Sequence, residues 1–362
     1  MNISITARLY KSWVLTCLLL VFCMIVIGGL TRLTESGLSI VQWKLLSGVL
    51  PPLSTEAWDA EFAAYQTTPE YALENATMKL ADFKGIFWLE YLHRLLGRLI
   101  GLCTLIPLGF LLMQRHSPRW LRVRMTVITL LIGMQGTVGW YMVKSGLIDV
   151  PWVSPYRLAL HLSLAVTIFG LLLVTLLRLS AAAAPSSKAI AAQLRPFCRL
   201  SLAVLFIQII LGAFVAGLDA GFTYNTFPLM DGDFVPETLW QLSPWPRNLF
   251  ENIATVQFLH RWWAFVVTAI LLLTAWRIFI LPTSREQRCL AIAMVCTVAL
   301  QVALGIATLI MVVPTGLATL HQAMAVVLFA WVVWLNYRVH PLIDAAQEFA
   351  GGHPSNQRPL IV

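Results

Sequence analysis

The chain has 362 residues, of which 59% are hydrophobic and only 12% are charged, and its mean hydropathy is +0.77. This composition excludes an ordinary soluble globular domain and is typical of a protein that lies largely within a lipid bilayer. The net charge of +8 would suit nucleic-acid binding if the basic residues clustered in a polar region. They lie instead mainly in short connections between apolar segments, so we interpret the charge as a determinant of membrane orientation and expect no nucleic-acid partner.

Eight apolar segments are long enough to cross the roughly 30 Å hydrocarbon layer as α-helices. The first has no small-residue cleavage site, so we expect it to be retained as a membrane helix. Lys and Arg are more frequent in the connections on the side of the N-terminus, which predicts that both termini are cytoplasmic. The expected spans lie near residues 12–30, 86–112, 122–142, 157–178, 198–216, 253–280, 288–312 and 316–338.

The first outer connection, residues 31–85, is by far the longest. Trp58, Phe62 and Tyr65 recur at a spacing that places them on one face of a surface helix. Thr68-Pro69 is typical of the start of a second helix, with threonine as the N-cap and proline at the first helical position. Long connections of this kind often serve as lids over binding sites, and a platform on the lipid surface is the equally weighted alternative.

The pattern of the first half restarts after the linker at residues 181–188. Residues 212–223 align with residues 28–39 without a gap, and residues 300–305 match residues 134–139. We interpret these matches as a tandem duplication of a four-helix unit. Because four is an even number, both copies would insert the same way up, related by an axis along the membrane normal.

The expected fold is therefore an all-α polytopic membrane protein made of two tandem four-helix bundles with a pseudo-two-fold axis. The first bundle would span residues 1–184, with the long outer connection inserted in it, and the second would span residues 185–362.

Four histidines lie inside the apolar segments: His93, His161, His260 and His321. All four would lie roughly 8–12 Å below the outer end of helices that run in the same direction. Each half would thus present two imidazoles at matching depth, which suits axial ligation of one haem iron from opposite faces. A single histidine of this kind could also be an ordinary hydrogen bonder between helices, and the repeated quartet is what favours haem.

The residue four positions after each histidine, on the same helix face, is always small, as expected beside a flat macrocycle. Small residues also allow helices to pack closely in membranes. Zinc or copper would require closer clustering with cysteine or carboxylate ligands. Since the six cysteines form no CxxC or CxxCH motif, we expect no disulfide framework, structural zinc or covalent c-type haem. The small residues are Gly97, Ala165, Ala264 and Ala325.

The two halves differ three residues before the first histidine of each, where Glu90 corresponds to Gln257. A carboxylate beside a bound porphyrin can move protons or stabilise a cation, whereas an amide cannot. The alternative is that Glu90 simply pairs with Arg94 one helical turn later. Four arginines near the outer surface could bind haem propionates or could extend to the interface in the ordinary way: Arg32, Arg94, Arg247 and Arg261.

These motifs together resemble the haem A synthase family of bacteria and mitochondria over nearly the whole chain. They are GGLTRLTESGLS at 28–39, EYLHRLLGR at 90–98, HLSLA at 161–165, NTFPLMDG at 225–232, QFLHRWW at 257–263 and HQAMA at 321–325. Some bacterial members have a cysteine pair in the first outer connection. This chain has none there, and so resembles the branch shared with mitochondria.

The resemblance implies oxidation of the C8 methyl group of haem O to a formyl group through a hydroxymethyl stage, which yields haem A for cytochrome oxidase. It implies a resident haem b on His260 and His321, and a substrate haem on His93 and His161 with Glu90 as the essential acid. It also implies a haem O synthase as a partner and a location in the bacterial inner membrane, with the haem sites toward the outer side.

Two other functions stay open at this point. One is a bis-histidine cytochrome b with two equivalent haems that only transfers electrons, and the other is a haem exporter or chaperone. The difference between Glu90 and Gln257 argues against two equivalent haems. A homo-oligomer is possible on either view.

Overall fold

A computed structural model describes residues 3–44, 47–114, 117–146, 152–180 and 187–339. These residues form α-helices and short 3₁₀ turns and contain no β-strand, apart from an isolated bridge between Met230 and Asp233. Eight of the helices are long and apolar enough to cross a membrane, so the chain is a multi-pass α-helical membrane protein, as predicted. They are α1 (Ile3–Leu33), α4 (Leu80–Met113), α5 (Arg119–Gly146), α6 (Pro155–Leu179), α7 (Lys188–Gly217), α9 (Ile253–Ile280), α10 (Arg285–Ile310) and α11 (Thr315–Val339).

Several helices extend beyond their predicted apolar segments because polar residues cap them outside those segments. Ser284 caps α10 by accepting a hydrogen bond from the backbone N–H of Gln287, whose side chain reaches back to the N–H of Ser284. Ser187 caps α7 by accepting from the N–H of Ile190. Asn252 caps α9 through the N–H of Thr255, and this helix begins and ends where predicted. The predictions followed hydropathy alone and therefore placed most helix ends too close to the membrane centre.

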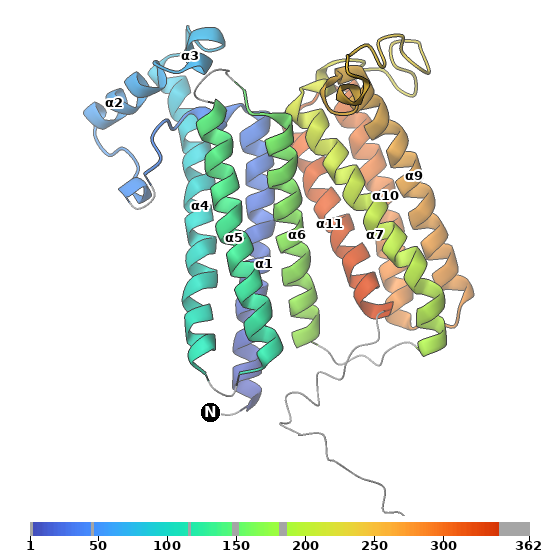
Figure 1. Cartoon of the computed structure of the whole chain (residues 1–362). Helices are drawn as coiled ribbons and strands as arrows, with labels where there is room; N and C mark the ends of the chain where they lie inside the picture. Colours follow the sequence, from blue (N-terminus) through green and yellow to red (C-terminus); the bar gives the residue numbers. More distant parts are fainter. Residues whose placement is uncertain (1–2, 45–46, 115–116, 147–151, 181–186, 340–362) are drawn as a thin grey trace, which may run out of the picture.

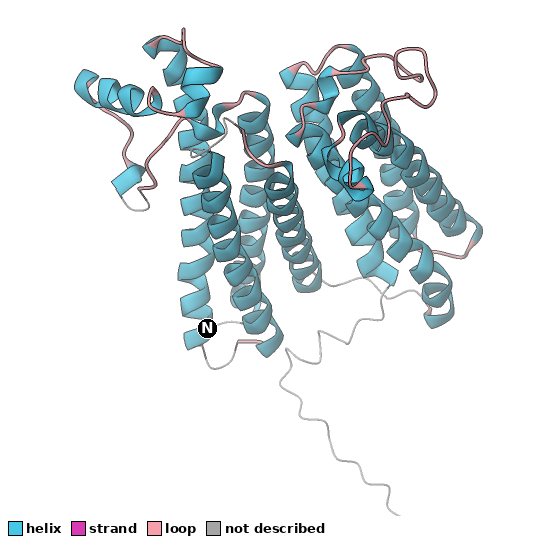
Figure 2. Cartoon of the chain, turned by 45° about the horizontal axis from the view of Figure 1, so that its top comes forward, coloured by secondary structure: helices cyan, strands magenta, loops and turns pink. Residues whose placement is uncertain are grey.

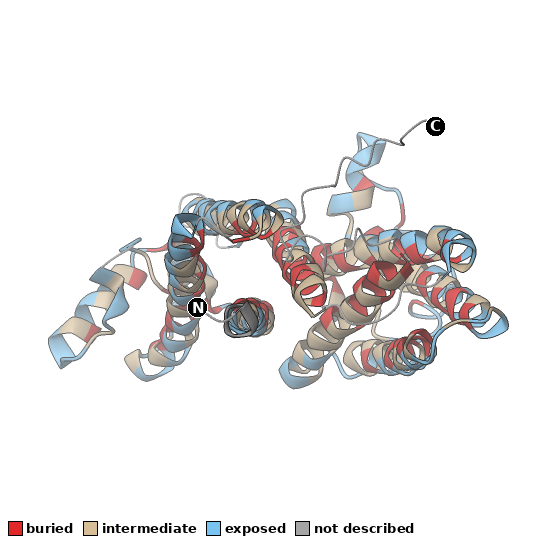
Figure 3. Ribbon diagram, turned by 90° about the horizontal axis from the view of Figure 1, so that it is seen from below, coloured by how far each residue is buried: buried red, intermediate tan, exposed pale blue. Residues whose placement is uncertain are grey.

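The long helices form two groups of four that stand side by side (Figure 1). In the first group α1 packs on α4 and α6, and α5 packs on both of these. In the second group α7 packs on α9 and α11, and α10 packs on both of those. The groups meet through α1 against α11, α6 against α7, and α6 against α11. Seen along the helix axes, buried residues lie mainly where helices face one another, and exposed residues lie mainly on the outside (Figure 3).

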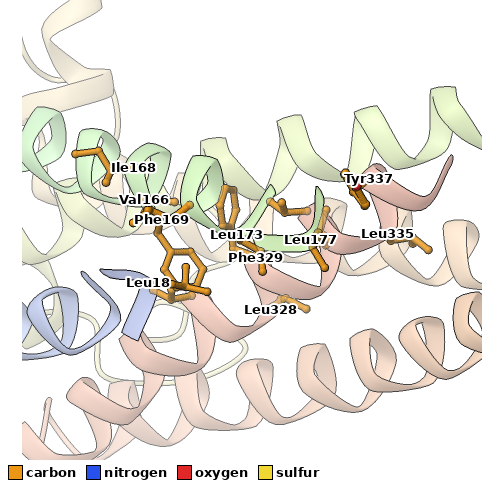
Figure 4. Packing of buried hydrophobic residues seen from close by; sticks show 14 of the residues in the cluster. Leu18, Val166, Ile168, Phe169, Leu173, Leu177, Leu328, Phe329, Leu335 and Tyr337 are labelled. Atoms are coloured by element: carbon orange, nitrogen blue, oxygen red, sulfur yellow. The ribbon is translucent and has the colours of Figure 1, made fainter. Parts of the chain in front are cut away.

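The hydrophobic core lies at this junction between the two groups. Figure 4 shows Phe169, Leu173 and Leu177 of α6 packed with Leu328 and Phe329 of α11. The two helices approach closely at Gly170, where a Cβ atom would lie 3.2 Å from Cε1 of Phe329. More than half of the apolar window of α6 is buried, but almost none of that of α5. The central helices thus hold the two groups together, and α5 contributes least to the buried core.

The first outer connection contains two short helices, α2 (Thr55–Tyr65) and α3 (Pro69–Leu73), which lie at the outer end of α4 (Figure 2). Thr68 caps α3, and Pro69 begins it, as predicted. Trp58 and Tyr65 are buried and Phe62 packs beside them, so the predicted face is confirmed. Their partners on α4 include Phe83 and Phe87. α4 begins at Leu80, after Lys79, whose backbone N–H donates to the side chain of Asp82.

The boundary predicted at residues 184 and 185 and the tail after residue 339 lie outside the described residues. The division into two duplicated bundles and the pseudo-two-fold axis therefore stay predictions, although the two groups have the same order of neighbouring helices.

Candidate functional site

One large cavity lies between the helices and is lined by residues of all eight long helices, including His93, His161, His260 and His321. Its volume of about 1870 Å³ is well above the roughly 300–1,000 Å³ typical of a pocket for one drug-sized ligand. All four histidines lie in helices long and apolar enough to cross a membrane, and the structure brings them together on the wall of this cavity. Most of the wall is apolar, so the few polar groups on it stand out as candidates for binding and chemistry.

Each histidine ring lies against a glycine of a neighbouring helix. This arrangement occurs at all four positions, twice in each group of helices, and the absence of a Cβ atom is what lets the imidazole approach the backbone. A Cβ atom would come within contact distance of Cε1 of the ring in every case: 3.4 Å at Gly28 for His93, 3.0 Å at Gly139 for His161, 3.1 Å at Gly212 for His260, and 2.8 Å at Gly305 for His321.

Three of these glycines follow a glutamine one helical turn earlier, and each such glutamine contacts the same histidine. The amide Nε2 of Gln135 donates to the backbone carbonyl of His161 at 3.1 Å. Gln208 and Gln301 donate to the carbonyls of His260 and His321 at 3.0 Å each. The fourth position, one turn before Gly28, is a methionine. Met24 faces the cavity, and its thioether cannot donate such a bond.

Buried polar atoms beside these contacts have no hydrogen-bond partner among the described residues. They are the side-chain oxygens of Gln135, Gln208 and Gln301, and Nδ1 of His161 and His321. Buried polar groups are nearly always paired in folded proteins, and an exception calls for an explanation such as a bound ligand.

The cavity fits the haem predicted from sequence. All four small residues that follow the histidines line its wall, which leaves room beside each ring: Gly97, Ala165, Ala264 and Ala325. No group of three or more His, Cys, Asp or Glu in the described part of the chain could hold a metal ion. Paired imidazoles without further protein ligands suit an iron whose other four ligands come from a porphyrin. The described cysteines are all free thiols.

Glu90 is buried on the cavity wall, with 3% of its surface exposed. Its Oε2 accepts hydrogen bonds from the Ser39 hydroxyl and from the backbone N–H of Ile40, both at 2.7 Å. Its Oε1 is 2.5 Å from a guanidinium nitrogen of Arg94. The ion pair between Glu90 and Arg94 is therefore present, as the structural alternative to a chemical role of Glu90 predicted. The carboxylate also anchors the turn that follows α1.

Gln257 occupies the equivalent place in the second group and is also buried. Its Nε2 donates to the backbone carbonyls of Ala220 at 2.7 Å and Thr223 at 2.5 Å, while its Oε1 accepts from Arg261 at 3.0 Å. The turn after α7 therefore presents acceptors to residue 257, whereas the turn after α1 presents donors to residue 90. The amide and the carboxylate each match the groups that face them.

The arginines near the outer surface are all engaged with protein groups. Arg94 donates to the carbonyls of Ile40 and Gln42, and Arg261 donates to those of Tyr224 and Thr226. Arg98, one turn deeper, donates to the carbonyl of Lys44 at 2.8 Å. These contacts hold the outer segments against the helix ends, and binding of propionates by Arg94 or Arg261 stays a prediction.

The other two arginines form ion pairs. Arg32 lies 2.6 Å from the carboxylate of Asp219, which joins the outer ends of the two helix groups. Arg247 pairs with Glu251, also at 2.6 Å. The role of Arg98 and the Arg32–Asp219 contact could not be found from sequence, because each joins residues that are distant along the chain.

The outer connection contributes carboxylates to the cavity as well. Glu70 and Glu74, in and just after α3, line it together with Glu35. Glu70 has 4% of its surface exposed, and its Oε2 has no hydrogen-bond partner in the described residues. Burial, and then the nearby charges of Glu90, Glu35 and Glu74, raise the pKa of Glu70 to about 8. The sequence carries no signal that distinguishes Glu70 from the other acidic residues of this polar connection.

Comparison with known proteins agrees with this architecture. The chain belongs to the family described as cytochrome oxidase assembly protein, whose sequence model matches residues 11–333.

Within that family, the chain is similar to proteins named heme A synthase. It is 46% identical over 329 residues to that of Nitrosospira multiformis, covering 90% of this chain and 92% of the relative. It is 45% identical over 329 residues to that of Rhodospirillum centenum, covering 91% and 88%. It is 46% identical over 336 residues to that of Bradyrhizobium diazoefficiens, covering 92% of each chain.

Proposed function

We propose that this protein is a haem A synthase, which oxidises the C8 methyl group of haem O to a formyl group for cytochrome oxidase biogenesis. The observation that carries the proposal is the single cavity that gathers two pairs of histidines, each against a glycine, inside a chain similar to heme A synthases over about 90% of its length. The size of the cavity supports two macrocycles rather than one.

The two pairs have different roles in this proposal. His260 and His321 hold a resident haem b, which supplies a one-electron path away from the reacting site. His93 and His161 hold the substrate haem. The assignment is supported by Glu90, which lines the cavity beside the first pair, whereas the corresponding residue of the second group is the amide Gln257.

Conversion of a methyl to a formyl group is two successive two-electron oxidations that add one oxygen atom and release protons. Glu90 is the carboxylate nearest in sequence to a ligand of the substrate haem, and its charge is held in place by Arg94 and by the N–H of Ile40. We assign it the role of accepting protons or stabilising positive charge that develops at the methyl carbon. Burial of the carboxylate strengthens both effects because water does not screen it.

The experiment compares Glu90→Gln with the wild type in membranes that contain haem O. Haem A formation is expected to fall by roughly 10²-fold or more, the usual contribution of a positioned acid or base. Total haem bound should stay near the wild-type level, since no ligand changes. Extracted haems are separated and weighed by mass spectrometry, and an accumulating hydroxymethyl product would place the defect at the second oxidation.

The control is the reciprocal Gln257→Glu, which should not create a second active site. Normal haem A formation by Glu90→Gln would rule out a catalytic role. Parallel loss of haem A and of total haem would show that residue 90 serves only to anchor the turn at Ser39 and Ile40. A wild type that binds two haems but forms no haem A would favour the electron-carrying cytochrome b.

The proposed location is the bacterial inner membrane, with both termini in the cytoplasm and the cavity opening toward the outer side. Alkaline phosphatase fused after residue 338 should be inactive, and a fusion within residues 54–84 should be active. The opposite result would reverse the orientation. We also propose that a haem O synthase delivers the substrate directly, because free haem O is poorly soluble, and that copies of the chain can associate.

A further inference from the structure

The strongest unexplained feature of the cavity is that its polar contacts are unequal at the four histidines. His161, His260 and His321 each lie beside a glutamine, and His93 lies on the helix that faces Met24. The glutamines come from three different helices, α5, α7 and α10, and each lies four residues before the glycine that contacts the same histidine. Met24 takes the place of the glutamine near His93, one of the two histidines that we assign to the substrate haem.

The contact involves the ring as well as the backbone. Nε2 of Gln208 lies 3.2 Å from Nδ1 of His260, and Nε2 of Gln301 lies 3.5 Å from Nε2 of His321. The amides of Gln208 and Gln301 therefore lie beside the imidazole ring, whereas Gln135 contacts the backbone carbonyl of His161. The side-chain oxygens of all three glutamines are buried and have no partner within the described residues, and the same holds for Nδ1 of His161 and His321.

A histidine that binds iron through Nε2 must carry its proton on Nδ1, and that N–H needs an acceptor. The acceptor also sets the orientation of the ring and its strength as a ligand. A glutamine amide provides an oxygen for this purpose, while its nitrogen can keep the bond to the backbone of the same histidine. A methionine thioether is a weak acceptor and offers no equivalent.

We propose that Gln135, Gln208 and Gln301 are positioning residues that accept the Nδ1–H of their histidines when haem is bound, and that His93, opposite Met24, is the one weakly supported axial ligand. This inference rests on the proposed function. On this proposal three of the four histidines bind iron with support from a glutamine, and His93 binds it without such support and therefore more weakly. It gives a physical reason why one haem stays while the other, held by His93 and His161, can be exchanged as substrate and product.

The first test uses the site that we assign to the resident haem b, where Gln208 can be replaced without changing the ligands His260 and His321. Gln208→Met removes both the acceptor and the bond to the His260 backbone, whereas Gln208→Glu removes the backbone bond but keeps a stronger acceptor. The reduction potential of the low-spin haem is expected to rise in Gln208→Met and to fall in Gln208→Glu. If Gln208 only holds the backbone of His260, both variants lose the same hydrogen bond and the reduction potential should shift in the same direction in both.

The matched control is Gln322→Met. Gln322 lines the same cavity next to His321, but its Nε2 donates to the carbonyl of Ile25 on α1 at 2.8 Å. Its replacement removes a buried amide contact without touching an imidazole, so the haem potential should not shift. If either Gln208 variant fails to retain haem, the pair Gln301→Met and Gln301→Glu on the opposite ligand is compared in the same way.

The second test concerns His93 and changes the exchange rate instead of the potential. Met24→Gln introduces the missing amide, and haem loss from the first site to an excess of apomyoglobin should slow by roughly 10-fold to 100-fold, the usual size of such an outer contact. Gln135→Met should speed that loss by a similar factor.

Opposite shifts of potential and a slower exchange in Met24→Gln support the proposal. Unchanged or same-sign shifts in proteins that retain haem overturn it, and so does an unchanged exchange rate in Met24→Gln. A wild type that binds no haem would instead refute the proposed function, so the two failures are distinguishable.

Discussion

The turns after α1 and α7 begin with the same backbone conformation but end differently, with Ser39 in the helical region and Thr223 extended, and they present opposite hydrogen-bonding groups. Glu35 and Asp219 both adopt the left-handed conformation, with φ 52° and ψ 27° in the first and φ 52° and ψ 26° in the second. Each is followed by a short 3₁₀ turn that is anchored by the residue three positions before a histidine. In the first turn the backbone N–H of Ile40 donates a hydrogen bond to Glu90, and in the second the carbonyl of Ala220 accepts a hydrogen bond from Gln257.

This comparison shows how two similarly arranged groups of helices support two different sites, because the backbone after each turn presents different groups to residues 90 and 257. The glycine beside each histidine and the small residue after it are shared by both groups of helices, so both can accommodate a flat ligand. The groups differ in charge at residues 90 and 257 and in the presence of an amide at residues 24 and 208. They differ also in the outer connection, which places Glu70 and Glu74 on the cavity only at the first site.

The largest expected effect follows from removing a ligand of the resident haem. His260→Ala or His321→Ala should abolish the low-spin haem b that co-purifies, because each iron would lose one of its two protein ligands. His93→Ala and His161→Ala should leave that spectrum intact and should lower only the content of substrate haem. Absorption and electron paramagnetic resonance spectra of the four purified variants make the measurement. A bis-histidine haem b that persists in both His260→Ala and His321→Ala would show that our assignment of the resident site is wrong.

A smaller effect is expected on stability when the glycines that contact the histidine rings are replaced by alanine, and it should differ between Gly305 and Gly28. Gly305→Ala would bring a Cβ atom to 2.8 Å from His321, so the ring or α10 must move, whereas Gly28→Ala would leave 3.4 Å to His93. The first substitution should cost about 1–3 kcal/mol of stability, as overpacking usually does, and the second should cost clearly less. Thermal unfolding and haem content of the two purified variants test this order. Equal effects at both glycines would mean that the rings do not depend on this close approach.

The smallest expected effect is the pH dependence caused by Glu70. Its pKa of about 8 lies above the ordinary value of 4.5, so the folded chain binds this proton more tightly than the unfolded chain does. Stability from this group is therefore present at low pH and is lost as the pH rises from about 5 through 8. The groups that face Glu70 are Tyr65, Glu35, Glu74 and Glu90.

Glu70→Gln should remove this dependence, because an amide does not titrate. The midpoint of thermal unfolding is measured for both proteins from pH 5 to pH 9, and the difference between them isolates the contribution of Glu70. Glu74→Gln, at an exposed side chain, serves as the control and should keep most of the dependence, because Glu74 is the smallest of the causes that raise the pKa of Glu70. A difference that stays constant with pH would show that Glu70 is charged throughout and is not buried against the other carboxylates.

The membrane helices, and the small residues on the same helix face as each histidine, could be predicted from the sequence because their signals are local. Hydropathy over about 20 residues identifies a membrane helix, and helical periodicity places Gly97 on the same face as His93 and Ala264 on the same face as His260. The amphipathic face of α2 and the capping by Thr68 followed from the same short-range rules, and all of these predictions hold in the described residues.

The chemistry around the histidines depended on contacts that only the tertiary structure could decide. The partners of Glu90 lie about fifty residues away in sequence, and those of His260 and Gln322 lie on other helices. Hydropathy assigns each helix to the membrane but does not fix its rotation or its neighbours, because lipid tails and apolar side chains attract one another about equally. Close packing of small residues and interhelical hydrogen bonds set that rotation, and they thereby decide which glutamine faces which histidine.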